Sequence, residues 1–380
     1  MTDTERFESL DAWRGVCALL IAFYHYIYML PSGLRDVSFL HNSYLFVDFF
    51  FVLSGFVIFH AYRDRIDNDI GALTFAIRRF GRVWPAHMTV LIGFAIILAI
   101  IATLPHSNNF NITLTQGEHS VRAFLLQIVL LNAVGLQDGT TWNGPAWSIG
   151  AEFYTYLVFA CVVLLWRRRL AIVSIVLSLL ALAIILWRAP TYMNSTWDYG
   201  LFRCVAGFFA GGVAYHVHER YRAVPLKFAT AAEVAGLTVV VLLVIGAGHS
   251  PDVVSVRSLA APLVFAVAIL IFARERGSIS LLLRLAPFRA AARYSYSIYI
   301  THQLVLVLIV YLTWFTGIRE ESAPPQQLGV FQSWPTGFLP FVFLAAILLV
   351  SAASYHFIEV PSRRYVNRVA KRLHERAHNQ

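Results

Sequence analysis

The sequence predicts an all-α, polytopic integral membrane protein with about ten transmembrane helices and both termini in the cytoplasm. Only 13% of its 380 residues are charged and 58% are hydrophobic, whereas a soluble domain carries about 25% charged residues. The mean hydropathy is +0.64, and apolar runs that approach the roughly 20 residues needed to cross a bilayer recur along the chain. Residues 1–380 are therefore interpreted as one membrane domain, with a core over 8–362 and a basic cytoplasmic tail over 363–380.

Clusters of Lys and Arg predict the orientation of the spans. Five such clusters separate the apolar runs, and the positive-inside rule places all five in the cytoplasm. This requires the short apolar segment 122–136, which no basic cluster follows, to be re-entrant or interfacial. The loops 105–121 and 315–336 are then the longest external segments. The ten predicted spans are 10–30, 43–62, 84–104, 147–166, 170–187, 199–217, 228–246, 257–273, 294–314 and 337–357.

The remaining composition excludes several classes of protein. The net charge is +9, but the basic residues lie in topogenic clusters without a recognition module, so no nucleic-acid partner is expected. Cys17, Cys161 and Cys204 lie in apolar runs without ligand spacing, so neither a disulfide framework nor a metal site is predicted. The first apolar run starts with Asp11 and Arg14 and lacks an evident cleavage site, which favours a permanent anchor.

Ionisable residues inside the predicted spans are the first candidates for function, because they are costly in lipid. Arg14 and His25 lie eleven residues apart, which puts them on one helix face about 16 Å apart along the axis. Asp48 and Glu152 fall at a depth similar to that of His25. A histidine with one or two carboxylates is the composition of a general-base site. The alternative is a structural polar network that joins three helices.

A second layer of charge is expected at the cytoplasmic end. Arg79 and Arg82 are one turn apart on one face, and Arg14 lies near them in depth. Guanidinium groups without matching carboxylates suit an anionic, phosphate-bearing ligand. Topogenic charge or lipid headgroup binding is the ordinary explanation for any one of them. His302, on the ninth span, either lines the cavity or is a packed and satisfied histidine.

These segments resemble, in order and over nearly the whole chain, the membrane acyltransferase 3 family. The matching motifs are Arg-x10-His at Arg14 and His25, FFxLSGF at 50–56, Arg-x-x-Arg at Arg79 and Arg82, Trp-Ser-x3-Glu-x-Tyr at Trp147, Ser148, Glu152 and Tyr154, SYSIYxxHQ with Ser295, Tyr299 and His302, and Glu-x-Pro at Glu359 and Pro361. Phe153 stands where the commoner form of the family has a second Glu.

The resemblance implies a membrane O-acyltransferase of the bacterial inner membrane, with Arg14 and His25 as an essential pair. The implied cosubstrate is cytoplasmic acyl-CoA, usually acetyl-CoA, with no tightly bound cofactor. The implied acceptor is a hydroxyl of a surface glycan, a glycolipid or another sugar-containing molecule, and the chain resembles the stand-alone members that lack an extracellular hydrolase-like domain. The competing hypothesis is a transporter or flippase whose intramembrane polar residues form a proton relay. The acceptor, the acyl chain length, the oligomeric state, and the choice between direct transfer and an acyl-enzyme intermediate are left open.

Overall fold

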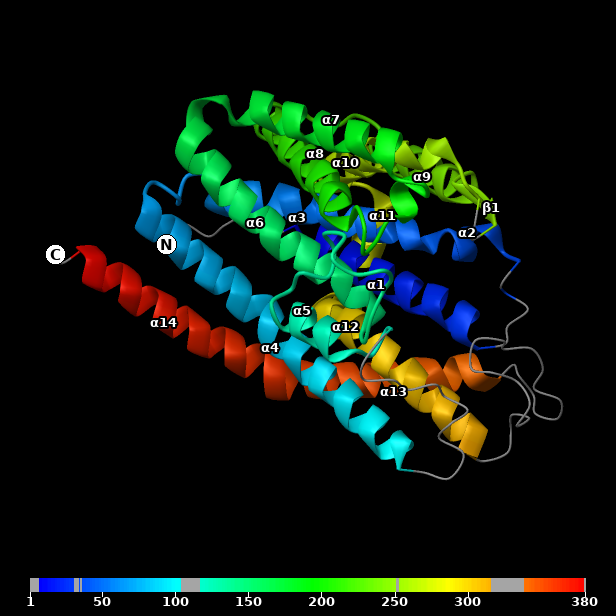
Figure 1. Ribbon diagram of the computed structural model, residues 1–380. Helices are drawn as coiled ribbons and strands as arrows, with labels where there is room; N and C mark the ends of the chain where they lie inside the picture. Colours follow the sequence, from blue (N-terminus) through cyan, green and yellow to red (C-terminus); the bar gives the residue numbers. More distant parts are fainter. Residues whose placement is uncertain are drawn as a thin grey trace.

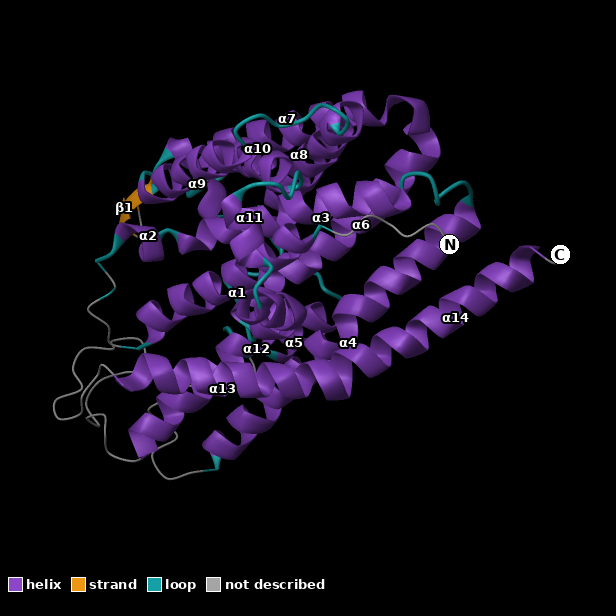
Figure 2. Cartoon of the chain, turned by 180° about the vertical axis from the view of Figure 1, so that it is seen from behind, coloured by secondary structure: helices purple, strands orange, loops and turns teal. Residues whose placement is uncertain are grey.

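The computed structural model describes residues 7–30, 34, 36–103, 117–250, 253–315 and 338–378. Its regular structure is almost entirely helical, with one short β-hairpin (Figure 2). The predicted loop 315–336, apart from residue 315, and most of the loop 105–121 lie outside the described residues. The elements are α1 Glu8–Met29, α2 Ser38–His41, η1 Ser43–Leu45, α3 Phe46–Tyr62, α4 Asp69–Ala102, α5 Val121–Ile128, η3 Gly144–Ala146, α6 Trp147–Trp166, η4 Arg167–Arg169, α7 Leu170–Arg188, η5 Tyr192–Asn194, α8 Gly200–Tyr221, α9 Ala229–Ile245, β1 Gly248–Ser250, β2 Val253–Val254, η6 Val256–Ala260, α10 Ala261–Phe272, α11 Ser278–Leu283, α12 Ala286–Phe315, α13 Leu339–Ser354, the π-helical turn η8 Tyr355–Glu359 and α14 Val360–His378.

A helix occupies each of the ten segments that the sequence predicts as spans. Within the described part of the chain, six helical segments are long and apolar enough to cross a membrane, and one of them, Gly144–Arg188, contains both α6 and α7. The count of ten crossings and the cytoplasmic position of both termini stay predictions. The longest helix, α4, begins well before its predicted span because Asn68 caps it, accepting a hydrogen bond from the Gly71 amide at 2.8 Å.

The helices form a bundle in which segments distant in sequence lie side by side (Figure 1). Helices α7, α8, α9 and α10 make up one side, α4, α12, α13 and α14 make up the other, and α1, α3 and α6 lie between them. Small residues allow the closest approaches: a Cβ added at Gly15 would stand 2.5 Å from the Ala291 carbonyl carbon, which brings α1 against α12. The middle layer of helices is therefore held from both sides.

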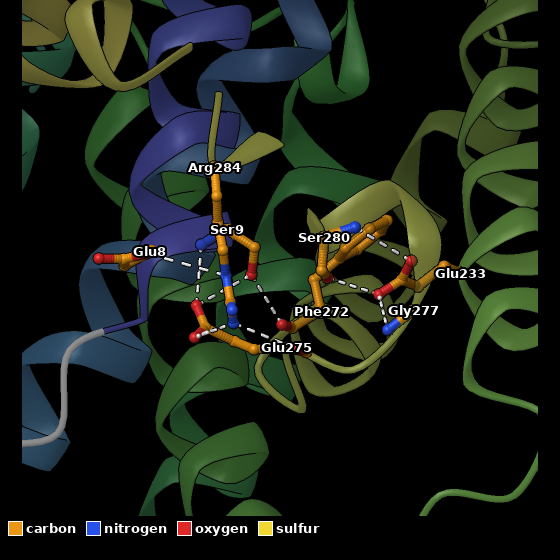
Figure 3. Close-up of polar contacts among 8 residues, drawn as sticks. All are labelled: Glu8, Ser9, Glu233, Phe272, Glu275, Gly277, Ser280 and Arg284. Carbon is orange, nitrogen blue, oxygen red and sulfur yellow. Dashed lines mark hydrogen bonds and ion pairs between the residues drawn. The ribbon is translucent and has the colours of Figure 1, made fainter. Parts of the chain in front are cut away.

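A buried carboxylate joins α9 to α11 near the start of α1 (Figure 3). Glu233 accepts hydrogen bonds from the amides of Gly277, Ile279 and Ser280 at 2.9–3.1 Å, so it caps α11 from a different helix. Beside it, Glu275 accepts from the Ser9 amide at 2.8 Å and pairs with Arg284 at 2.9 Å. These contacts fix the N-terminal end of α1, from which Arg14 projects one turn further on.

The segment 122–136 returns to the side of the molecule from which it starts. It contains the short helix α5, and Arg122 donates a hydrogen bond to the carbonyl of Leu136 at 3.1 Å. The Trp142 amide likewise donates to the Glu118 carbonyl at 3.2 Å. Both ends of the segment are therefore in contact, and its re-entrant or interfacial place in the membrane stays a prediction.

The C-terminal basic segment is part of a helix. Residues 363–378 belong to α14, which packs along α4 (Figure 1), and a Cβ at Gly81 would meet the side chain of Val366. Helix α14 ends at the same end of the bundle as the turn between α3 and α4, opposite β1. The predicted tail is thus a folded element that covers one face of α4.

Candidate functional site

Three cavities lie in sequence through the layer of α1, α3, α6 and α12. The first, here called the vestibule, has a volume of about 760 Å³ and is lined from the N-terminal part of α1. The second, the central cavity, is smaller at about 130 Å³ and shares Arg14 and Arg82 with the vestibule. The third, the histidine cavity, measures about 240 Å³ and shares Val47 and Tyr299 with the central cavity. A large polar chamber is therefore followed by a small one and then by a chamber that contains an imidazole.

The vestibule carries an excess of positive charge. Its acidic lining residues are Glu8, Asp11 and Glu359, and its basic ones are Arg14, Arg82, Arg289, Arg293 and Arg363. Guanidinium groups present paired N–H donors that match phosphate oxygens. The excess of guanidinium over carboxylate groups suits an anionic ligand larger than a single ion.

The central cavity brings together all three arginines that the sequence predicts as a phosphate site: Arg14, Arg79 and Arg82. One expectation is corrected here, because Arg14 has a carboxylate partner, Asp11, at 2.8 Å. Arg79 donates to the Tyr62 hydroxyl at 2.9 Å. The Nε atoms of Arg14 and Arg79 are nevertheless buried without a hydrogen-bond partner among the described residues, and a buried orphan donor is unfavourable until a ligand meets it.

Glu152 also lines the central cavity, among these arginines, rather than the histidine cavity. The sequence places it in the same layer as His25, but α6 aims the side chain toward the guanidinium groups. The expected pairing of Glu152 with the imidazole is therefore not the arrangement in the structure. Its carboxylate is placed to balance the charge of the arginine cluster instead.

A hydroxyl pair separates the central cavity from the histidine cavity. The Ser148 Oγ lies 2.6 Å from the Tyr299 hydroxyl, and both atoms lie 3.1 Å from the carbonyl oxygen of Pro145. Both side chains were predicted as candidates from their motifs. The structure brings them together although α6 and α12 are far apart in sequence, and Tyr299 lines both cavities.

His25 lines the histidine cavity, and its nearest ionisable partner is another histidine. The His25 Nδ1 lies 3.0 Å from the Ile21 carbonyl oxygen and 3.2 Å from the His302 Nε2. His302 is fully buried, and its Nδ1 lies 2.6 Å from the Tyr299 carbonyl oxygen. His302 lines none of the three cavities, so of the two alternatives the structure supports the packed and satisfied histidine, here in contact with the cavity residue His25.

Asp48 is engaged elsewhere, which corrects the expectation that it holds the imidazole. Its two carboxylate oxygens accept from the Nε and one terminal nitrogen of Arg203 at 2.9 and 2.8 Å. Arg203 further donates to the carbonyls of Ser195 and Tyr44, both at 3.0 Å. Both charged side chains are at most 1% exposed, so this pair joins α3 to α8 as a structural element.

Two further predicted residues have supporting positions. Trp147 is buried and lines the histidine cavity. Its ring centroid lies 5.2 Å from the Cζ of Arg203, which is a cation–π contact. Glu359, at the end of the π-helical turn, accepts a hydrogen bond from the Ser297 hydroxyl at 3.0 Å and lines the vestibule.

The sequence analysis did not identify Arg203, although an arginine inside an apolar span is itself a signal of function or of a buried pair. Arg289 and Arg363 belong to the basic clusters that the sequence analysis used only to predict topology. Their position at the vestibule depends on how the helices pack.

Comparison with known proteins agrees with this geometry. A family profile described as an acyltransferase domain matches residues 7–356. Protein 2 in the picA locus of Rhizobium radiobacter is 30% identical over 189 residues, which are 48% of this chain and 93% of that protein. Acyltransferase MdmB of Streptomyces mycarofaciens is 37% identical over 125 residues, which are 32% of this chain and 28% of that protein. No solved structure matches the chain significantly.

The profile covers most of the chain, from the start of α1 into the π-helical turn. It includes every lining residue of the three cavities except Glu359 and Arg363 of the vestibule. The chain is a multi-pass membrane acyltransferase and belongs to the acyltransferase 3 family.

Proposed function

We propose that the protein transfers an acyl group, most simply acetyl, from cytoplasmic acyl-CoA to a hydroxyl of a surface glycan or other sugar-containing acceptor. The observation that carries this proposal is the order of the cavities: arginines at one end, a small central cavity, and an imidazole at the other end. Acyl-CoA has the same order, with a wide phosphorylated head and a thin arm that ends in the thioester. The bacterial inner membrane is the proposed location, because there the two substrates are on opposite sides.

The wide head of acyl-CoA fits the vestibule, where Arg14 and Arg82 meet the phosphates. The thin arm then follows the central cavity toward Tyr299. Arg14 and His25 are eleven residues apart on one helix, which corresponds to about 16 Å. An extended pantetheine arm is long enough to bridge that separation, so the thioester reaches the boundary of the histidine cavity.

The chemistry needs a base at that boundary. In the proposed step, His25 accepts the proton of the acceptor hydroxyl while the hydroxyl oxygen attacks the thioester carbonyl carbon. The tetrahedral oxyanion accepts hydrogen bonds from the Ser148 and Tyr299 hydroxyls, which turn from the Pro145 carbonyl to meet it. When the C–S bond breaks, the CoA thiolate takes the proton from the imidazolium, and the ester and CoA–SH leave on opposite sides.

The test is acyl transfer by the purified protein in lipid nanodiscs, with radiolabelled acetyl-CoA and a sugar acceptor. Wild type is expected to label the acceptor, and His25→Gln to lose transfer by about 10²–10⁴-fold, because an amide does not take up a proton at neutral pH. His25→Gln should still bind acyl-CoA, since the phosphate contacts are distant. Transport of a sugar-containing solute without consumption of acyl-CoA would instead support the transporter hypothesis.

The acceptor itself is best identified in cells. NMR of surface glycans from strains with and without the gene reports which sugar carries the acyl group. Loss of one set of acetyl signals in the deletion strain is the expected result. Unchanged acylation of all surface glycans would move the proposal to a small-molecule acceptor.

A further inference from the structure

The contact between the two histidines restricts where their protons lie. A backbone carbonyl only accepts hydrogen bonds, so the 2.6 Å contact to the Tyr299 oxygen requires a proton on His302 Nδ1. In the neutral ring, His302 Nε2 is then an acceptor. It lies 3.2 Å from His25 Nδ1, which is therefore the donor.

A second contact independently requires a proton on His25 Nδ1. His25 Nδ1 also lies 3.0 Å from the Ile21 carbonyl oxygen, which again requires a proton on Nδ1. One assignment, with Nδ1 protonated on both rings, is therefore compatible with every contact of this pair, and the single His25 Nδ1 proton is then shared between the Ile21 oxygen and His302 Nε2. It leaves the lone pair on His25 Nε2, the ring nitrogen that makes none of these contacts, in a residue that lines the histidine cavity.

The pair is held by rigid elements. His25 lies on α1 and His302 on α12, the two helices brought together at Gly15, where an added Cβ would stand 2.6 Å from the Ala292 nitrogen. His302 is fully buried, so its ring has little freedom to turn. The two carboxylates predicted to hold the imidazole have other partners. Asp48 pairs with Arg203, and Glu152 lies among the arginines of the central cavity.

We propose that His302 is a positioning residue that keeps His25 in the Nδ1-protonated tautomer and shares the positive charge formed when Nε2 takes the acceptor proton. It does for His25 what a carboxylate does for the histidine of a hydrolase triad, but as a neutral acceptor. Since only one proton is gained by the two rings, the charge is delocalised along the line from His25 Nδ1–H to His302 Nε2. This inference rests on the proposed function and adds a residue to it.

The kinetic test compares two replacements of His302 in the purified, lipid-embedded protein. His302→Phe keeps a ring but removes the acceptor, and kcat is expected to fall by about 10²-fold or more. His302→Gln places an amide oxygen near the former Nε2 and should recover most of that loss, to within about tenfold of wild type. KM for acyl-CoA should change in neither, because the vestibule is distant.

His87 supplies a matched control. Like His302, it is fully buried and lines none of the three cavities, and its Nε2 donates to the Gln127 carbonyl at 2.9 Å, but His302 contacts His25 and His87 does not. His87→Phe therefore measures the general cost of replacing a buried histidine that bonds to a carbonyl. Equal losses in His302→Phe and His87→Phe, equal losses in His302→Phe and His302→Gln, or a change confined to KM would each overturn the proposal.

A measurement of the tautomer does not depend on activity. Nitrogen-15 NMR of protein labelled at its 13 histidines, compared with His25→Gln, identifies the His25 signals by their loss. We expect a protonated Nδ1 and an unprotonated Nε2 at neutral pH. A protonated Nε2 would overturn the inference even if acyl transfer is intact, whereas absence of transfer with the expected tautomer would contradict the proposed function alone.

Discussion

The Asp48–Arg203 pair shows how a buried charge is tolerated in the bundle. Two hydrogen bonds join the carboxylate to the guanidinium, and two backbone carbonyls accept from two of the three remaining N–H donors. Asp48→Asn should destabilise the protein by about 3–5 kcal/mol, because Arg203 would keep its charge without a partner in a dry site. Thermal unfolding in detergent measures this loss.

The double variant Asp48→Leu with Arg203→Met separates this role from catalysis. Removing both charges is expected to restore much of the stability, and activity should recover with it. If Asp48 were instead the partner of His25, Asp48→Asn would unfold at the wild-type temperature, and the double variant would stay inactive.

The arginines of the central cavity give a prediction about the donor. Arg79→Lys and Arg82→Lys should each weaken acyl-CoA binding by about tenfold, because a point charge replaces a planar fork of donors. Arg78→Lys is the matched control, since Arg78 is the neighbour of Arg79 but does not line the cavity. Isothermal titration with CoA gives the affinities.

A CoA analogue that lacks its 3′-phosphate refines the same prediction. If an arginine contacts that phosphate, the analogue should lose less affinity with the variant than with wild type, as for any coupled pair. Equal losses in wild type and in every variant would leave the arginines with a role in topology only.

At the scale of elements, the contact between α3 and α8 depends on glycines. A Cβ at Gly211 would meet the carbonyl oxygen of Val52, and one at Gly55 would meet that of Phe208. Gly211→Ala should therefore force the helices apart and destabilise the protein by about 1–3 kcal/mol. Gly139→Ala is the control, because nothing lies within 4 Å of its added Cβ. Similar unfolding temperatures for the two variants would contradict a close helix crossing.

At the scale of the whole molecule, the orientation in the membrane is open to a direct test. Gly117 and Asp138 flank the segment 122–136, and both are exposed. Single cysteines at these positions, in a background without Cys17, Cys161 and Cys204, should both react with an impermeant reagent from outside the cell. A cysteine at Arg168, in the basic cluster after α6, should react only after lysis. Opposite reactivities at Gly117 and Asp138 would show that the segment crosses the membrane.

The sequence by itself determined the helices and the composition of the site. Apolar runs have a length set by the bilayer, so each of the ten predicted segments contains a helix. The fixed rise of 1.5 Å per residue also separates Arg14 from His25 along α1, and the structure has Arg14 at the vestibule and His25 at the histidine cavity. These properties are local, because they depend on residues within one helix.

Only the tertiary structure decided which side chains meet. His302 lies 277 positions from His25, and Arg203 lies 155 from Asp48, so both partners depend on how whole helices pack. Depth along an axis can be counted from the sequence, but the azimuth of a neighbouring helix is set by close approaches such as that of Gly15 to Ala291. Glu152, which the sequence places in the same layer as His25, therefore lines the central cavity with the arginines and not the cavity that contains the imidazole.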